Sequence, residues 1–462
     1  MMRHVIGKSL VLGLVAIGVG CSTVRQARQA QEEASASVAS APDRPPVPLN
    51  GTLAELVDFA LTNRPSVLSA RLAVTDARLR MKEIAANAPV LSSTPWNAAD
   101  LSVGGGYSES SVGEHFSDFD FTTKRGKATG SLSLDLLVYD FGRNAAEARA
   151  QADRVIAAEM SLQEREYAVF REVVAGVASL REALSLRQVA ETNAVAAAAH
   201  LEQVRLRERE GEAKKLDVLK AELTLAQAVE SLVGASNDVV TAGANLVQAA
   251  GGGSLGLEDL GSGREIASER GHLVPVSSDD IIQLAETNAP AMQVARARAR
   301  AASADVDRAI ADLYPSLSAS ASLSWTDPLW YLRWGVNAAQ SLFTGFRKTT
   351  AVDRSVVALQ SAVATVNETS LNVRHDLDLA LAARENAAEM LRTATDTRRT
   401  AEENFALVDE QYRIGEANRV DYADALKAVA EARGTQAKAE AAALRAEATI
   451  YQVLGLAPNY FN

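Results

Sequence analysis

The sequence predicts an α+β membrane protein with two similar halves, each carrying strands followed by long helices. One observation is a repeated aromatic strand end that leads into arginine, offset by 204 residues: Val138-Tyr139-Asp140-Phe141-Gly142-Arg143 and Leu342-Phe343-Thr344-Gly345-Phe346-Arg347. A second is that the same offset relates two further pairs of segments: Arg209–Asp217 with Arg413–Asp421, and Leu246–Gly251 with Ile450–Gly455. A constant offset indicates long packed helices, because loops accept insertions readily. The duplication therefore favours one body made of two halves.

Composition narrows the functional classes. The 462 residues carry a net charge of −11, the wrong sign for a nucleic-acid binder. A single cysteine excludes a disulfide framework or a cysteine-based metal cluster. The five histidines are scattered without zinc-binding spacing, and neither a nucleophile elbow nor a P-loop occurs in the sequence. We therefore expect no enzyme activity, no cofactor and no metal.

The first twenty residues have the pattern of an export signal peptide. Arg3 and Lys8 precede an apolar run, Leu10–Gly20, that is too short to span a bilayer comfortably. It ends at Gly18-Val19-Gly20-Cys21, which resembles a bacterial lipobox, although Gly18 replaces the usual leucine. Cys21 is thus expected to be acylated and to anchor the mature chain in lipid. The alternative is an ordinary secretory signal followed by an incidental cysteine.

The expected domain organisation follows from composition and from the duplication. Residues 1–20 form the signal peptide, and residues 21–50 a lipidated N-terminus with a proline-rich tether. The first repeat spans 51–253, a linker 254–277, the second repeat 278–458 and a tail 459–462.

Each repeat is predicted to open with a short helix that ends at Asn-x-Pro. These motifs are Asn63-Arg64-Pro65 and Asn288-Ala289-Pro290, at an offset of 225. A second helix follows and is expected to end near Pro89 or Pro315, since proline breaks helices.

Strands are predicted next, because apolar residues alternate with serine and other polar residues. The alternating positions are Leu132, Leu134, Leu136 and Val138 in the first half and Leu317, Ala319, Ala321, Leu323 and Trp325 in the second. The change of offset from 225 to 204 locates a surplus in the first hairpin region, where Gly113–Gly126 is expected to be a long polar loop. Four aromatic residues at the second hairpin have the composition of an interfacial girdle: Trp325, Trp330, Tyr331 and Trp334.

One very long helix is predicted after the strands of each half, over about 143–208 and 347–412. Some 65 residues would span roughly 100 Å. Val352, Val356 and Leu359 begin a coiled-coil period in the second helix, whereas Glu159 and Glu166 interrupt it in the first. After a turn at Gly211 or Gly415, a returning helix of about 35 residues is expected. In the first half its seam is predicted to be Leu219, Leu223, Ala226, Val233, Val240 and Val247.

Four strands of this kind cannot close on themselves. A sheet with two raw edges is costly in lipid, where unpaired backbone groups find no water. Three copies of the chain would supply twelve strands, within the range of bacterial barrels.

This combination of features resembles the TolC family of outer-membrane channel-tunnel proteins, in its lipoprotein subtype. The resemblance covers residues 50–458 and rests on the duplication, the Asn-x-Pro openings, the strand exits and the Arg-x-Gly turns. It implies a homotrimer with a twelve-stranded barrel in the outer membrane of a Gram-negative bacterium, continuing into a helical coiled-coil barrel in the periplasm. It also implies a periplasmic adaptor (membrane fusion) protein and an inner-membrane pump of the RND or ABC type as partners.

The resemblance also assigns candidate residues at the turn after the second long helix. The family places two acidic residues three apart as rings around the periplasmic aperture, and Asp421 and Asp424 match them. Six carboxylates near a threefold axis would repel one another and attract cations or protons. Taken alone, such a pair is an ordinary solvated helix face. Ala417 stands where some members have a latching arginine, so a latch here would differ, with Arg419 as one candidate.

The first half offers only Asp217 at the equivalent acidic position. Gly211 and Gly415 are expected to adopt tight or left-handed turns. Arg209 and Arg413 are candidates for adaptor contact, and helix C-terminal charge is the alternative explanation.

The sequence leaves three functions open. The first is a passive outer-membrane duct for small molecules, and the second is the outer-membrane component of type I protein secretion with an ABC transporter. The third is a structural coiled-coil lipoprotein, which the alternating strands argue against. The sequence does not identify the substrate.

Overall fold

The computed structural model describes residues 24–35, 45–47, 53–86, 99–116, 119–211, 213–253, 278–326, 329–414, 416 and 418–455. The expected signal peptide, Cys21, the linker, the tail, Gly415 and Ala417 lie outside the described residues. The elements follow one another in the order α2 (Leu53–Asn63), α3 (Pro65–Ala86), β1 (Ala99–Phe116), β2 (Phe119–Tyr139), α4 (Arg143–Arg209), α5 (Lys215–Ala250), α6 (Ser278–Asn288), α7 (Pro290–Ala311), β3 (Ser316–Thr326), β4 (Leu329–Ala339), α8 (Arg347–Ile414) and α9 (Arg419–Leu454).

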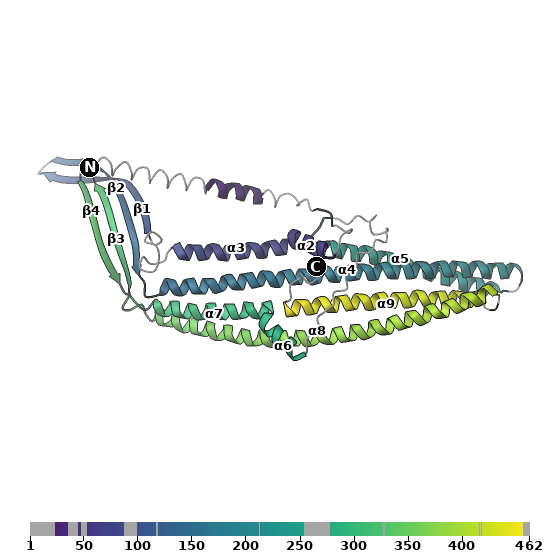
Figure 1. Ribbon diagram of the computed structural model, residues 1–462. Helices are drawn as coiled ribbons and strands as arrows, with labels where there is room; N and C mark the ends of the chain where they lie inside the picture. Colours follow the sequence, from purple (N-terminus) through teal and green to yellow (C-terminus); the bar gives the residue numbers. More distant parts are fainter. Residues whose placement is uncertain are drawn as a thin grey trace.

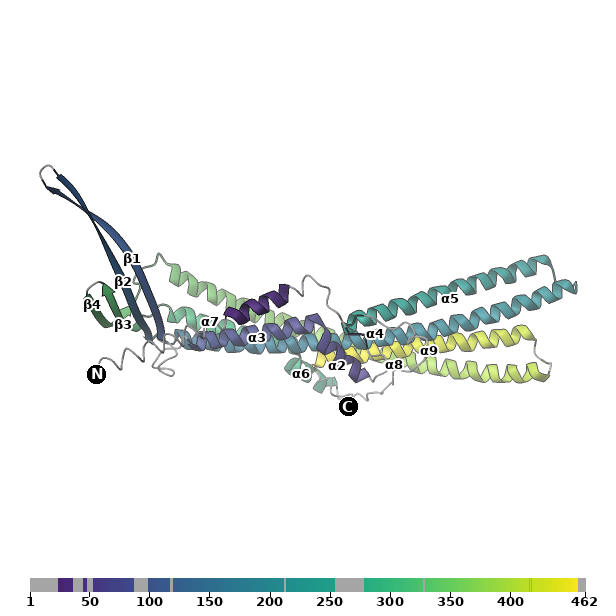
Figure 2. The ribbon, with the colours of Figure 1, turned by 90° about the horizontal axis from the view of Figure 1, so that it is seen from above.

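The molecule is a long rod with the strands at one end and two helical hairpins at the other (Figure 1). The prediction of two very long helices is confirmed: α4 has 67 residues and α8 has 68. The returning helices α5 and α9 have 36 residues each. Figure 2 shows the α4–α5 and α8–α9 hairpins running to the same end of the rod and separating there. Nearly equal helix lengths explain why the offset of 204 residues is constant in this part of the chain.

All four strands form one antiparallel sheet in the order β1-β2-β3-β4. The first hairpin is the longer, as predicted, but the expected polar loop over 113–126 is wrong. Gly113 pairs with Thr122, so most of that segment extends β1 and β2 beyond the second hairpin. The alternation also fails at Val138, because a bulge between Leu137 and Tyr139 pairs Tyr139 with Leu317.

α4 is the central helix of the rod, packed against α3, α5, α7 and α9. Its weak heptad pattern has a physical cause. Glu159 lies 2.6 Å from Arg78, and Glu166 lies 3.7 Å from Arg71, both on α3. The two glutamates that interrupt the apolar period are therefore the ion-pair partners of a neighbouring helix.

The main hydrophobic core lies midway along the rod, where α2, α3, α4, α5 and α9 meet. The returning helices α5 and α9 end here, against the Asn-x-Pro segments that separate α2 from α3 and α6 from α7. Gly251 (φ 73°) packs on Arg64, and Gly455 (φ 63°) packs on Asn288 and Pro290. A side chain at Gly455 would meet the Asn288 carbonyl at 2.7 Å, so both the glycine and the break are required.

Part of the segment expected to be a proline-rich tether contacts this core. The Gly253 N–H donates to the Pro45 carbonyl at 3.1 Å, and Val47 is buried among the core residues. The N-terminal segment is therefore fixed to the first repeat at residues 45–47.

The prediction of which α5 residues form its packing seam is wrong for contacts within the chain. Leu219, Leu223, Val233 and Val240 are each more than half exposed, whereas α5 buries a different row that includes Val218, Val239 and Leu246. Among the described residues, no helix combines the length and hydropathy needed to cross a bilayer.

Candidate functional site

The sheet has one apolar face and one polar face. Cross-strand register places Leu101, Leu134, Ala321 and Trp334 in one row of the apolar face, and Val103, Leu132, Leu323 and Leu332 in the next. The opposite face carries serines together with Asp100, Asp135 and Arg333 in the same register. Val103, Leu332 and Trp334 are among the most exposed large apolar residues of the chain. An uncovered apolar face of this kind is suited to lipid.

The aromatic girdle is only partly on that face. Trp325 pairs with Trp330 across the strands, with ring centroids 6.2 Å apart, and Trp334 lies on the same side. Tyr331 pairs with Ser324 and lies on the polar face, so it does not join the other three.

A second exposed apolar cluster was missed by the sequence reasoning. Leu342, Phe343 and Phe346 follow β4 at the opposite end of the sheet and are all strongly exposed, with the two Phe rings 5.8 Å apart in edge contact. These residues belong to the repeated segment that follows the strands. Its repetition in the sequence indicated the duplication, but it did not predict that these side chains are exposed. Aromatic residues at both ends of the strands are typical of the two membrane interfaces.

The strand exits share an uncommon backbone. Phe141 (φ 55°) and Gly142 (φ 89°) adopt left-handed conformations in the first half, as do Gly345 (φ 62°) and Phe346 (φ 60°) in the second. The aromatic residue and the glycine have thus exchanged order while the conformation is kept. In the first half the Asp140 carboxylate accepts from the N–H groups of Gly142 and Asn144, which stabilises the start of α4.

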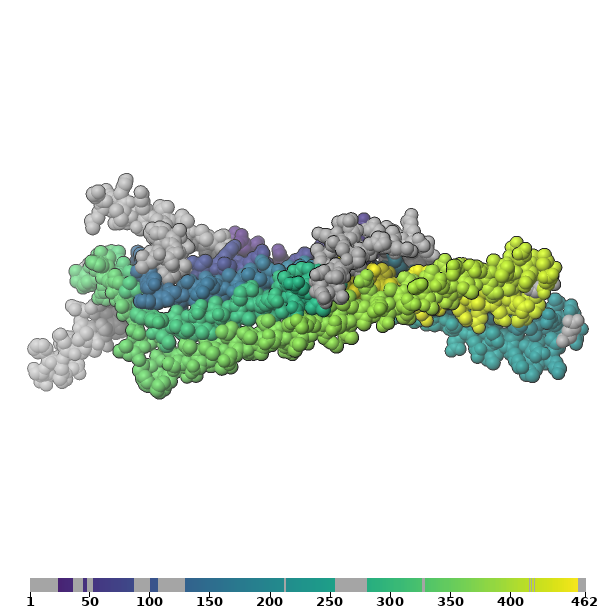
Figure 3. All heavy atoms as spheres, turned by 60° about the horizontal axis from the view of Figure 1, so that its bottom comes forward, coloured from purple at the N-terminus to yellow at the C-terminus, as the bar shows by residue number. Residues whose placement is uncertain are grey.

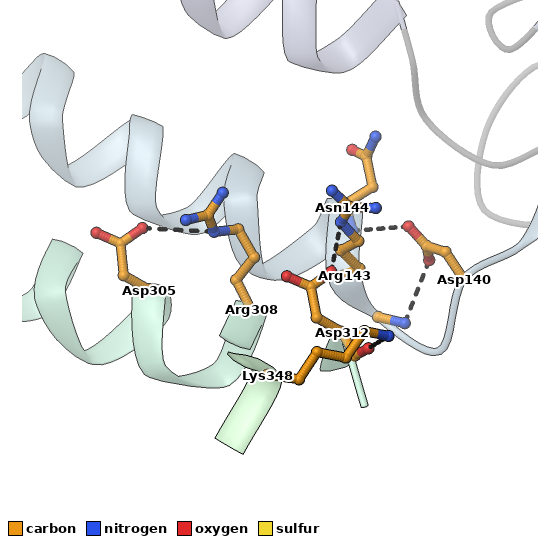
Figure 4. A network of polar contacts seen from close by, with 8 residues as sticks. Asp140, Arg143, Asn144, Asp305, Arg308, Asp312 and Lys348 are labelled. Carbon is orange, nitrogen blue, oxygen red and sulfur yellow. Dashed lines mark hydrogen bonds and ion pairs between the residues drawn. The ribbon is translucent and has the colours of Figure 1, made fainter. Parts of the chain in front are cut away.

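Asp312 connects the strand exits of the two halves (Figure 4). Its carboxylate pairs with Arg143 of α4 at 2.9 Å, and its backbone carbonyl accepts from Lys348 of α8 at 2.5 Å. Because Asp312 ends α7, this contact fixes the starts of both long helices against α7, beneath the sheet.

At the tip of the first hairpin, Gly211 has φ 80° with open space around it, as expected for a left-handed turn. Asp217 accepts from the Lys214 N–H at 3.1 Å at the start of α5. Arg209 is exposed, whereas Arg413 pairs with Asp409 at 2.7 Å on its own helix.

At the second tip, Asp421 has a structural role as well. Its carboxylate accepts from the Asn418 N–H at 3.3 Å, and the Asn418 side chain accepts from the N–H groups of Val420 and Asp421. This reciprocal capping box begins α9. Asp424 is exposed one turn further on and takes no part in the cap. Sequence reasoning could have found the box from its Asn-x-x-Asp spacing.

An aromatic cluster lies beside these carboxylates. Tyr422 contacts Phe405 and Tyr412, with ring centroids 5.4 and 5.1 Å apart. The first hairpin instead has a small aliphatic cluster of Leu201, Val218 and Ala221. The two tips therefore differ in chemistry although their backbones correspond. Among the described residues, no group of three or more His, Cys, Asp or Glu could hold a metal ion.

A protein-family model described as outer membrane efflux protein matches residues 56–252 and 281–456. No curated protein sequence matches the chain significantly.

Solved structures share the fold at low sequence identity. The outer-membrane channel OprN has a TM-score of 0.72 at 19% identity, covering 89% of this chain and 91% of its own. The Campylobacter jejuni CmeC outer membrane channel has a TM-score of 0.71 at 15% identity, covering 87% of this chain and 85% of its own. The outer membrane protein VceC from Vibrio cholerae has a TM-score of 0.68 at 19% identity, covering 87% of this chain and 96% of its own.

Proposed function

The chain belongs to the outer membrane efflux protein family, and from that premise we propose that three copies form a passive exit duct through the outer membrane of a Gram-negative bacterium. The duct carries small molecules that an inner-membrane pump delivers through a periplasmic adaptor. In this proposal the duct itself catalyses no reaction, and the partner pump supplies the energy.

The observation that carries this proposal is the open sheet with its uncovered apolar face. β1 and β4 are the edge strands of the described sheet, and each has one neighbour. In lipid their free backbone groups would each cost several kcal/mol. Three copies remove these edges by closing twelve strands into a barrel. The polar faces with their serines then line the lumen.

The helical end of the rod is proposed to reach into the periplasm. α4 and α8 are each roughly 100 Å long at 1.5 Å per residue. The tips are the proposed adaptor contact, with Arg209 as the leading candidate because Arg413 is already paired. Asp421 and Asp424 are the proposed aperture rings, and Cys21 is the proposed lipid anchor.

A matched pair of substitutions in β4 tests the membrane assignment. Leu332→Asp alters the apolar face, and Tyr331→Asp alters the polar face of the same strand. The side chains of Leu332 and Tyr331 are 72% and 54% exposed in the single chain. Neither substitution therefore removes a core contact within the chain, so loss of such a contact cannot explain a difference between the two variants.

We expect Leu332→Asp to abolish dye export by cells that carry the pump and adaptor, and channel conductance in planar bilayers, because a charge is placed in lipid. Tyr331→Asp should retain both. Equal activity of the two variants would contradict a lipid-facing sheet.

A further inference from the structure

The polar face of the sheet carries its charges in separate layers. Cross-strand register places Asp100 opposite Asp135, in the same row as Ser320 and Gly335. Arg333 lies in the next row of this face, toward the β3–β4 hairpin. The three charged side chains are exposed, and none of them pairs with an opposite charge within the described part of the chain. The face is therefore acidic near the helices and basic one row further out.

The first hairpin continues past the second one as a two-stranded ribbon. Pairing of β2 with β3 ends at Thr129–Thr326, whereas pairing of β1 with β2 continues to Phe116–Phe119. Figure 2 shows the β1–β2 ribbon running beyond β3 and β4. The extra length is roughly 30 Å at about 3.4 Å per residue. Among the described strands β2 has no second neighbour beyond Thr129, and free backbone groups are costly in lipid, so the ribbon belongs in water.

The second hairpin shows where the bilayer ends. β4 is exposed along nearly its whole length, and β3 and β4 lie at the surface at one end of the rod (Figure 3). Where these strands meet, Trp325 is in contact with Trp330, and an aromatic pair of this kind is typical of a membrane interface. Gly130 of β2 pairs with Trp325. The ribbon therefore begins at the outer interface of the membrane.

Basic residues occupy the polar face of the ribbon just outside this interface. The register pairs Lys127 with Ser108 and Arg125 with Ser110, in two rows that continue the polar face of the sheet. Lys124 is next to Arg125 in the sequence and so belongs to the opposite face. The chain has a net charge of −11, so a basic layer at one height of one face does not follow from its composition.

Distance along the strands decides which of these charges act together. The rows of Arg333 and Asp135 are adjacent on one face, about 7 Å apart, which is within a Debye length of about 8 Å. Arg333 thus offsets part of the charge of the aspartates. Lys127 lies roughly 27 Å from Asp135 along β2, or about three Debye lengths. The basic layer of the ribbon is therefore screened from the acidic layer.

We propose that Arg125 and Lys127 form a cationic ring at the outer mouth of the duct, and that this ring binds anionic groups of permeants, such as carboxylate, sulfonate or phosphate. The inference rests on the proposed function, because three chains must close the barrel with their polar faces toward one lumen. Rings of charged side chains set the ion selectivity of pores, since they concentrate counter-ions in the permeation path. Permeants with an anionic group are therefore the class that the exit favours.

Reversal potentials in planar bilayers under a potassium chloride gradient measure the ring. Arg125→Ser and Lys127→Ser each remove one basic residue from the polar face, and Lys124→Ser removes one from the opposite face as the matched control. We expect each ring variant to lower the chloride-to-potassium permeability ratio about twofold, because the local field falls with each charge. The double ring variant should lower the ratio further, and Lys124→Ser should leave it unchanged.

The control distinguishes the lumen from the outer surface of the ribbon. An equal change in Lys124→Ser and in the ring variants would overturn the lumen position, since a charge on the side of the lipid phosphates would then act as well. An unchanged ratio in both single ring variants would overturn the ring itself.

A polyvalent anion tests the site in the wild-type channel. Naphthalenetrisulfonate added on the side of the ribbon should block the potassium current, and raising the salt concentration should weaken the block. The double ring variant should need about tenfold more of this anion for half block, because the charges that attract it are removed. Absence of block in wild-type channels, or equal block in the double variant, would overturn the proposal.

The same recordings separate the ring from the duct. Wild-type channels that conduct, with a permeability ratio that no ring variant changes, would overturn the ring and leave the duct intact. Purified wild-type protein that never conducts would overturn both. If the double ring variant fails to assemble, the two single variants and the block of the wild-type channel still decide the outcome.

Discussion

The hydroxyl of Tyr167 donates to the carbonyl of Gly455 at 2.8 Å, although the two residues are 288 positions apart in the sequence. Tyr167 lies in the middle of α4 in the first repeat, and Gly455 ends α9 in the second. Gln163 donates to the same hydroxyl at 3.0 Å, so the tyrosine is held from its own helix while it caps another. This contact joins the two repeats at the midpoint of the rod.

Replacing Tyr167 with Phe should lower stability by about 1 kcal/mol, because the Gly455 carbonyl loses its buried donor. Burial also raises the pKa of the Tyr167 hydroxyl above its ordinary value of 10.0. The folded chain therefore keeps this proton where the unfolded chain has lost it. The resulting stability is complete below about pH 10 and is lost as the pH rises through the folded pKa.

Thermal unfolding of wild type and Tyr167→Phe across pH 8 to 11 checks both effects, with Tyr314→Phe as an exposed control. The difference between wild type and Tyr167→Phe should shrink above about pH 10. A constant difference, or an equal loss in Tyr314→Phe, would contradict the cross-repeat cap.

Gly455 and Gly211 provide a second comparison, because both have positive φ but only one is crowded. A Cβ at Gly455 would lie 2.7 Å from the Asn288 carbonyl and the Pro290 ring, whereas Gly211 has open space. Gly211→Ala should cost about 1–2 kcal/mol from left-handed strain alone. Gly455→Ala should be clearly more destabilising, since the backbone it meets cannot move aside.

Melting temperatures of the two glycine variants provide the test. Equal shifts would show that the returning helix is not pressed against the Asn-x-Pro break.

The sequence predicted the long helices well, because the constant offset between the halves reports helix length directly. Prediction from the sequence failed where tertiary contacts override the local residue pattern. Glu159 and Glu166 weaken a heptad pattern, yet they pair with arginines on α3. The bulge after Leu137 and the strand pairing of Gly113 depend on cross-strand hydrogen bonds, which alternation alone does not specify.

The position of the candidate site at the tip of the second hairpin was predicted from the sequence. The role of Asp421 in capping α9 was not. Asp421 and Asp217 both accept a backbone N–H at the start of the returning helix. Helix capping therefore accounts for an aspartate at each of these two positions, whereas the exposed Asp424 takes no part in a cap.

For the aperture, Asp421→Ala with Asp424→Ala should raise single-channel conductance and weaken block by divalent cations, because the repelling carboxylates are removed from the permeation path. Asp217→Ala removes the same type of cap from the other hairpin and should leave conductance unchanged. Glu410→Ala removes an acidic side chain before the turn and should also have little effect.

Planar-bilayer recordings compare these variants. If Asp217→Ala reproduced the double variant, loss of helix capping would explain the result and the aperture assignment would fail. Asp409 is unsuitable as a control, since it pairs with Arg413.

For the anchor, Cys21→Ser should abolish incorporation of labelled palmitate, because Cys21 is the only cysteine of the chain. The unchanged chain serves as the positive control in the same cells. Continued labelling of the variant would refute acylation at Cys21.

Three chains are proposed to close one duct by joining the sheet edges that each chain leaves free. Cryo-electron microscopy of the detergent-purified protein tests it most directly. We expect a threefold particle in which β1 of each subunit pairs with β4 of the next. Single chains, or an assembly whose β1 and β4 edges stay unpaired, would contradict it.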